Sequence, residues 1–83
     1  RIKICGITRA EDGVAAAELG ADAIGLVFHQ GSRRCVDCDA ARRIVRSLPP
    51  LVTAVGLFLD ADGPFVSDVI SRVPLDLLQF HGN

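Results

Sequence analysis

The sequence predicts an α/β fold in which parallel strands alternate with helices. Two continuous apolar runs, at 23–28 and 52–59, are typical of strands that are buried on both faces. The segments that flank these runs have the three- and four-residue apolar spacing of amphipathic helices. Because the elements alternate strictly and their connections are short, we expect right-handed crossovers and a parallel sheet.

The expected order of elements is β-α-β-α-β-α-β. Strands are predicted at 2–5, 23–28, 52–59 and 75–80. Helices are predicted over 10–19, from Asp37 or Asp39 to about Leu48, and from a start near Pro64. The last strand runs into His81-Gly82-Asn83.

Local signals define the ends of these helices. Thr8, with Glu11 three residues later, forms a capping-box pattern that predicts the start of the first helix. Gly20 is a typical residue to end it. Pro49-Pro50 ends the second helix. The apolar stripe of the third helix is expected to be buried, and it consists of Phe65, Val66, Val69, Ile70 and Val73.

The size of the repeating unit points to a barrel. Each strand–helix unit spans about 25–30 residues, and eight such units make a small (β/α)8 barrel. The 83 residues would then form the first half of one barrel domain, 1–83, with no internal boundary. Alternation alone does not separate this fold from a flavodoxin-like doubly wound sheet.

Composition excludes several classes of function. The formal net charge is -1, and the basic residues do not gather on one face, so we expect no binding to nucleic acid or to anionic membranes. No apolar run is long enough to span a membrane. Three cysteines without regular spacing favour a reducing, cytoplasmic setting. The chain starts at Arg1 and contains no methionine, so we expect a piece of a longer protein.

Polar residues gather near the carboxyl ends of two predicted strands. Lys3 and Cys5 share one face of the first strand, and Gln79 and His81 share one face of the last. At a strand end a cysteine can act as a base or a nucleophile, or it can pack as a small apolar side chain. His81 is either a site residue or a loop histidine that bonds to the backbone.

The loop after the second strand offers two further candidates. Arg34 could form a bidentate pair with a carboxylate or a phosphate, or it could simply be solvated. Cys35 and Cys38 form a C-x-x-C pattern, but a structural zinc site needs a second pair of ligands, so we expect no metal site here. The glycines form neither a G-x-G-x-x-G nor a P-loop pattern.

The segment Lys3-Ile4-Cys5-Gly6-Ile7-Thr8 resembles the amino-terminal signature of phosphoribosylanthranilate isomerases. The resemblance continues in order and spacing along the chain. Its further motifs are Gly20-Ala21-Asp22-Ala23-Ile24-Gly25-Leu26-Val27-Phe28, Ser32-x-Arg34, Leu48-Pro49-Pro50, Val55-Gly56-Leu57-Phe58 and Leu75-Asp76-Leu77-Leu78-Gln79-Phe80-His81-Gly82.

The resemblance implies a (β/α)8 barrel isomerase of tryptophan biosynthesis that uses no cofactor. Its Amadori rearrangement converts N-(5-phosphoribosyl)anthranilate, a phosphorylated small molecule, to 1-(2-carboxyphenylamino)-1-deoxyribulose 5-phosphate. A general acid protonates the furanose ring oxygen, and a general base removes the C2′ proton of the iminium. The resemblance places the base on Cys5 and a contact to the anthranilate carboxylate on Arg34. It places Gln79 and His81 in the lumen beside the substrate.

The family keeps other parts of its site beyond the segment that these residues resemble. Its general acid is an aspartate on strand six, and its phosphate site is formed by the loops after strands seven and eight. We therefore expect the 83 residues alone to be inactive. Arg33 stands where the family often has proline, and Cys35 where an aromatic residue is common.

Two other readings remain open at this point. The first is another phosphate-binding barrel enzyme related to the epimerases, which would need metal ligands from several strands. The second is a half-barrel without enzymatic activity that acts only by assembly. Half a barrel exposes two strand edges and an apolar lumen, so such a chain is expected to self-associate.

Overall fold

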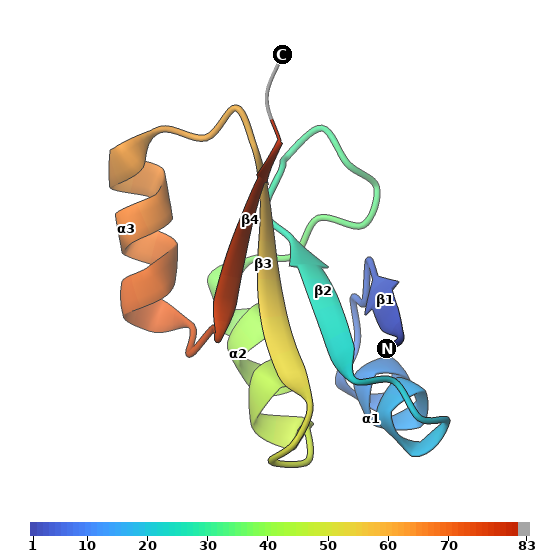
Figure 1. The fold of residues 1–83 in the computed structure, drawn as a ribbon. Helices are drawn as coiled ribbons and strands as arrows, with labels where there is room; N and C mark the ends of the chain where they lie inside the picture. Colours follow the sequence, from blue (N-terminus) through green and yellow to red (C-terminus); the bar gives the residue numbers. More distant parts are fainter. Residues whose placement is uncertain (82–83) are drawn as a thin grey trace.

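The computed structural model describes residues 1–81, so the predicted positions of Gly82 and Asn83 lie outside the described residues. Four strands and three helices alternate along the chain (Figure 1). In order they are β1 Lys3–Cys5, α1 Ala10–Glu18, β2 Ala23–Val27, α2 Cys38–Ser47, β3 Thr53–Leu59, α3 Gly63–Arg72 and β4 Leu77–His81.

The four strands form one parallel sheet in the order β1-β2-β3-β4. The predicted α/β fold is therefore confirmed. A doubly wound sheet reverses its strand order partway, and this sheet does not, so the flavodoxin-like alternative is wrong. With every crossover running in one direction, the helices line up along one face of the sheet and leave the other face open (Figure 1).

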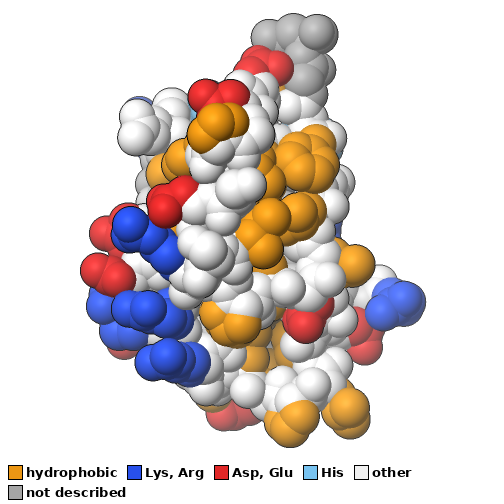
Figure 2. Space-filling model, turned by 90° about the vertical axis from the view of Figure 1, so that its left-hand side faces the viewer, with side chains coloured by type: hydrophobic (Ala, Val, Ile, Leu, Met, Phe, Trp, Pro, Cys, Tyr) orange, Lys and Arg blue, Asp and Glu red, His pale blue; other side chains and the backbone are white. Residues whose placement is uncertain are grey.

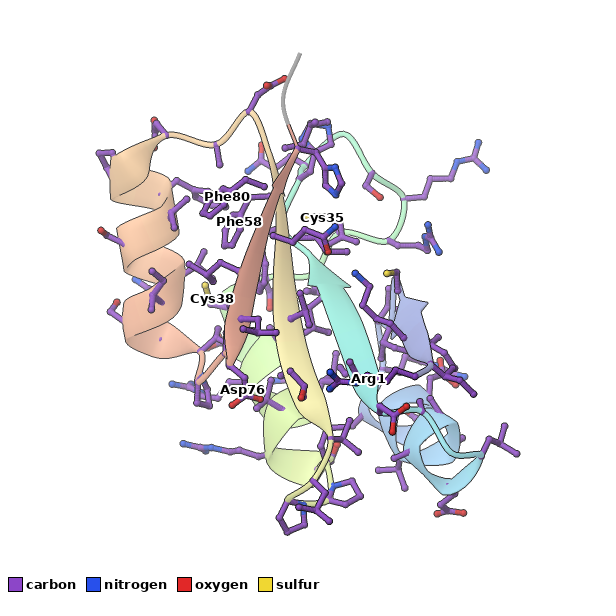
Figure 3. All side chains as sticks on the ribbon, in the orientation of Figure 1. Arg1, Cys35, Cys38, Phe58, Asp76 and Phe80 are labelled. Carbon is purple, nitrogen blue, oxygen red and sulfur yellow. The ribbon has the colours of Figure 1, made fainter. Side chains whose placement is uncertain are left out.

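The core lies between the sheet and the helices. Its fully buried members come from both layers: Ile24 and Leu26 on β2, Phe58 on β3, Ile44 on α2 and Val69 on α3. The ring of Phe58 stacks on those of Phe28 and Phe80, with centroids 5.4 and 5.5 Å apart. Phe58 and Phe80 are register partners on neighbouring strands and lie on the α3 side of the sheet (Figure 3).

The predicted capping box at the start of α1 is wrong. Arg9, not Thr8, is the N-cap residue, and among the described residues no side chain caps the helix. Arg9 instead pairs with the Asp12 carboxylate at 3.1 Å. The helix begins one residue after Arg9, whose backbone is extended, so Thr8 lies outside the first turn.

The other helix ends follow the sequence closely. Gly20 has a φ of 99° and donates to the Ala17 carbonyl oxygen, while Ala21 donates to that of Ala16, as in a Schellman motif. Asp37 caps α2 by accepting a hydrogen bond from the Ala40 amide at 2.7 Å, so Asp37 and not Asp39 is the N-cap. Pro64 lies in the first turn of α3 as predicted.

The predicted buried stripe of α3 is only partly correct. Val69 and Val73 are buried, but Phe65 is 38% exposed and Ile70 is 46% exposed. Val69 and Val73 belong to the buried core cluster, together with Phe58 and Ile44. No described element covers the outer side of α3 (Figure 1). The apolar stripe of α3 is thus wider than the part of the helix that the rest of the described structure covers.

Candidate active site at the carboxyl ends of the strands

Cys5 ends β1 on the open face of the sheet. Its register partner is Gly25 on β2. A Cβ atom at Gly25 would lie 3.2 Å from the Cys5 sulfur and 3.1 Å from the Leu57 Cδ1. Because Gly25 has no side chain, the Cys5 thiol and the Leu57 side chain can both lie over position 25 of the sheet.

Gly6 turns the chain directly after Cys5. Its φ is 83°, and its amide donates to the Gly25 carbonyl oxygen at 2.9 Å. A Cβ atom here would lie only 2.5 Å from Nη1 of Arg34. Glycine is therefore required for two reasons, since the backbone is left-handed and the Arg34 side chain occupies the space.

Arg34 lies in the loop that links β2 to α2. The backbone amide of Arg34 donates to Ser32 Oγ at 3.1 Å, and the Ser32 amide donates to the His29 carbonyl oxygen at 2.9 Å. These bonds shape the loop so that Arg34 crosses over to β1, where Nη1 donates to the Cys5 carbonyl oxygen at 3.4 Å. The Arg34 side chain is exposed and can bind an anion beside Cys5.

His81 lies near Arg34 at the mouth of the open face. A cavity of about 270 Å³ is lined by Ser32, Arg34 and His81, with Leu57 and Leu59 as its apolar wall. The Asp60 amide donates to the His81 carbonyl oxygen at 3.0 Å and holds the end of β4. Two of the predicted site residues, Arg34 and His81, therefore share one cavity.

His29 lines this same cavity and was not predicted as part of an isomerase site. The sequence offered one signal, because His29 directly follows the buried run 23–28 and so lies at the carboxyl edge of the sheet. The cavity combines a guanidinium group and two imidazoles. Such a set of donors suits an oxygen-rich anionic ligand.

Gln79 lies lower on the open face, away from this cavity. Its Oε1 accepts a hydrogen bond from Lys3 Nζ at 2.6 Å. Gln79 and Lys3 line a second cavity of about 400 Å³ toward the amino ends of the strands. The structure thus places Gln79 beside Lys3, and not in the cavity that Arg34 and His81 line.

The two remaining cysteines lie on the helix side of the fold. Cys35 and Cys38 are both free and line a cavity of about 560 Å³ with Arg72 (Figure 3). Burial raises the pKa of the Cys38 thiol, which makes it a poor nucleophile at neutral pH. Within the part of the chain that the structure describes, no three His, Cys, Asp or Glu side chains gather as a metal site requires. Among residues 1–81 no helix combines the length and apolarity needed to cross a bilayer.

Comparison with known proteins places these features in a family. Residues 2–83 match the family model of N-(5′-phosphoribosyl)anthranilate (PRA) isomerase. The chain is 63% identical over 83 residues to the N-(5′-phosphoribosyl)anthranilate isomerase of Pseudomonas aeruginosa strain LESB58, and 61% identical to that of Alcanivorax borkumensis. All of the chain is covered, but only 39% and 38% of these relatives, so the chain spans about two fifths of their length.

Solved structures give the same result. The phosphoribosyl anthranilate isomerase of Thermus thermophilus superposes with a TM-score of 0.93 at 44% identity, covering 100% of this chain and 42% of that one. The enzyme from Thermotoga maritima gives 0.95 at 46% identity, covering 100% and 40%. A phosphoribosyl anthranilate isomerase in complex with reduced 1-(o-carboxyphenylamino)-1-deoxyribulose 5-phosphate also gives 0.95 at 46%, covering 100% and 43%.

Proposed function

Because the chain belongs to the PRA isomerase family, we propose that the protein carrying it is a PRA isomerase of tryptophan biosynthesis. Residues 1–83 form the amino-terminal part of its single (β/α)8 barrel domain. The matches favour this function over that of an epimerase-related barrel. The protein acts in the cytoplasm, in keeping with its three free cysteines.

The proposed reaction is an isomerisation that needs one acid and one base. Protonation of the ring oxygen breaks the C1′–O bond and leaves an iminium ion. Loss of the C2′ proton to the Cys5 thiolate then gives an enolamine. The enolamine becomes the aminoketose when C1′ gains a proton and the C2′ hydroxyl loses one. The iminium makes the C2′ proton acidic, so a thiolate at a fixed position is a sufficient base.

The contact between Arg34 and Cys5 carries this proposal. The Arg34 guanidinium lies 3.4 Å from the Cys5 carbonyl oxygen and lines the cavity next to it. An anthranilate carboxylate bound to Arg34 would therefore lie close to Cys5. His81 and His29 would contact the same substrate in this cavity, and Gln79 would contact it from the floor of the open face.

The substrate is proposed to be N-(5-phosphoribosyl)anthranilate. The analogue bound to one related structure, reduced 1-(o-carboxyphenylamino)-1-deoxyribulose 5-phosphate, has the carboxylate and phosphate that the proposal requires. The general acid and the phosphate site are expected on strands beyond those described. The 83 residues alone are accordingly proposed to be inactive.

Activity of the full-length protein tests this proposal. We expect conversion of the aminoaldose to the aminoketose, followed by chromatography, without any added cofactor. Cys5→Ser should lower kcat by about 10²- to 10⁴-fold, the usual contribution of a general base. Cys38→Ser is the matched control and should retain activity. Failure of the wild-type protein to turn over, or an active Cys5→Ser variant, would contradict the proposal.

A further inference from the structure

Two side chains from opposite edges of the sheet meet over its open face. Lys3 Nζ, on β1, donates to Gln79 Oε1, on β4, at 2.6 Å. The strands β2 and β3 lie between them. In a flat sheet, strand spacings of about 4.8 Å would set β1 and β4 about 14 Å apart. A hydrogen bond across two intervening strands fits a sheet that curls toward this face, as the wall of a barrel does.

This hydrogen bond fixes which end of the Gln79 amide faces Lys3. A lysine ammonium group has donors only, so the atom that faces it must be the amide oxygen. The amide nitrogen of Gln79 therefore points away from Lys3, with two N–H groups to donate. In this orientation the free NH₂ group of the amide can donate hydrogen bonds to acceptors such as oxygen atoms, but it cannot accept them.

Among residues 1–81, Lys3 is also the sole Lys, Arg, Asp or Glu at the strand positions that share its face. The other positions that share this face are Cys5, Ala23, Gly25, Val27, Thr53, Val55, Leu57, Leu59, Leu77, Gln79 and His81. The three salt bridges found among residues 1–81 lie outside this face and involve Asp12, Asp39 and Asp68. The ammonium group thus pairs with a neutral amide, and its charge strengthens that bond.

We propose that Lys3 is a positioning residue that orients the Gln79 amide toward the substrate. Held by Lys3, the Gln79 nitrogen donates to an oxygen atom of the bound sugar. This inference rests on the proposed isomerase function, since the substrate is that of the isomerase. It assigns to Lys3 a role that acts through Gln79.

A double-mutant cycle in the full-length protein tests the coupling. Lys3→Met and Gln79→Leu should each lower kcat/KM about tenfold, near the upper end of what a hydrogen bond between neutral groups contributes. The kcat/KM of the double variant should equal that of the less active single variant, because either change already removes or disorders the same donor. Gln30→Leu, a glutamine away from this face, is the matched control and should change kcat/KM less than threefold, a change of about the size that surface substitutions produce.

A Gln79→Glu variant distinguishes a role of Gln79 in binding the substrate from a role in stabilising the fold. Its carboxylate still accepts from Lys3, so stability should be kept, but it cannot donate to the substrate. We expect kcat/KM to fall as far as in Gln79→Leu, while the thermal midpoint stays at the wild-type value. The side-chain amide signal of Gln79 in ¹⁵N NMR should shift in Lys3→Met, independently of activity.

The outcomes distinguish this inference from the proposed function. Absence of turnover in the wild-type protein would overturn the isomerase proposal. With turnover present, additive losses in the cycle would overturn the coupling of Lys3 to Gln79. A fully active Gln79→Glu variant would overturn the donor role of Gln79.

Discussion

Arg34 reaches over Gly6 to the end of β1, where its Nη1 donates to the carbonyl oxygen of Cys5 at 3.4 Å. The bond is long and therefore weak, but it joins two residues that are 29 positions apart in the chain. The candidate base and the candidate carboxylate contact are thus neighbours. Substitutions along this contact should change substrate binding and the chemical step in different proportions.

Replacement of Arg34 should weaken substrate binding. In the full-length protein, Arg34→Ala should raise KM about 10- to 100-fold, because it removes a charge-assisted hydrogen bond to a carboxylate. Arg34→Lys should recover only part of this loss, since an ammonium group lacks the planar fork of a guanidinium. Arg33→Ala in the same exposed loop is the control, and a KM change as large as that of Arg34→Ala would contradict the assignment.

Gly6→Ala should damage both stability and activity. The left-handed backbone should cost about 1–2 kcal/mol of unfolding free energy, and the new methyl group must displace the Arg34 side chain. Gly63→Ala is the control, because nothing lies within 4 Å of its Cβ position and its φ is not positive. Denaturant unfolding and steady-state kinetics would show whether the two glycines differ as expected.

Gly25→Ala should act mainly on the chemical step. Its methyl group would lie 3.2 Å from the Cys5 sulfur, so the thiol must shift from its place. We expect kcat to fall at least tenfold, because a base that is displaced by a fraction of an ångström loses alignment with its proton. Unchanged kcat in a folded variant would show that the position of the sulfur does not matter.

Asp37→Ala should destabilise α2. The Asp37 carboxylate accepts the Ala40 amide hydrogen bond at 2.7 Å, and loss of an N-cap costs about 1 kcal/mol. Asp39→Ala removes only an exposed pair with Arg42 and should change stability by less than about 0.5 kcal/mol. Urea unfolding of both variants measures the difference, and equal effects would contradict the cap assignment.

Alkylation of Cys38 should be slow at neutral pH. Burial, partly opposed by Arg72, raises the pKa of this thiol in the folded protein. In the unfolded chain the thiol ionises near its ordinary value of about 8.5. As pH rises, the Cys38 thiol therefore ionises in the unfolded state before it does so in the folded state. The stability that the neutral thiol contributes is complete below the pKa of the unfolded state and is lost as pH rises through the higher pKa of the folded state. In a variant that keeps Cys38 as its single cysteine, the rate of iodoacetamide labelling can be measured against pH. The pH midpoint of this rate should be higher for the folded protein than for the protein unfolded in urea.

The 83 residues by themselves should self-associate. Phe80 is 59% exposed and Leu77 is 58% exposed on β4, which within residues 1–81 pairs with another strand along one edge only. Hydrophobic side chains gather on the side of the molecule that carries α3 (Figure 2). Sedimentation should show oligomers that Phe80→Lys weakens, whereas Leu51→Lys, an exposed residue distant from β4, should have little effect. A monodisperse monomer would contradict this prediction.

The fold could be predicted because its determinants are local. The continuous apolar runs of β2 and β3 are typical of strands in a parallel sheet. Asp37 and Gly20 define helix ends through their own side chain and backbone, respectively. The cap of α1 was missed for a related reason. A capping box at Thr8 requires the helix to begin directly after that residue. After the turn at Gly6, the helix begins one residue later, after Arg9.

The sequence by itself determined the order of strands and helices along the chain. It also determined that Cys5 shares a strand face with Lys3 and that Gln79 shares one with His81, because residues alternate along a strand with a period of two. Only the tertiary structure decided which of them meet. The loop conformation brings Arg34 to Cys5, and the curl of the sheet brings Lys3 to Gln79. Both contacts join distant segments, so they depend on how the strands stagger and on how a loop folds back, which no local pattern encodes.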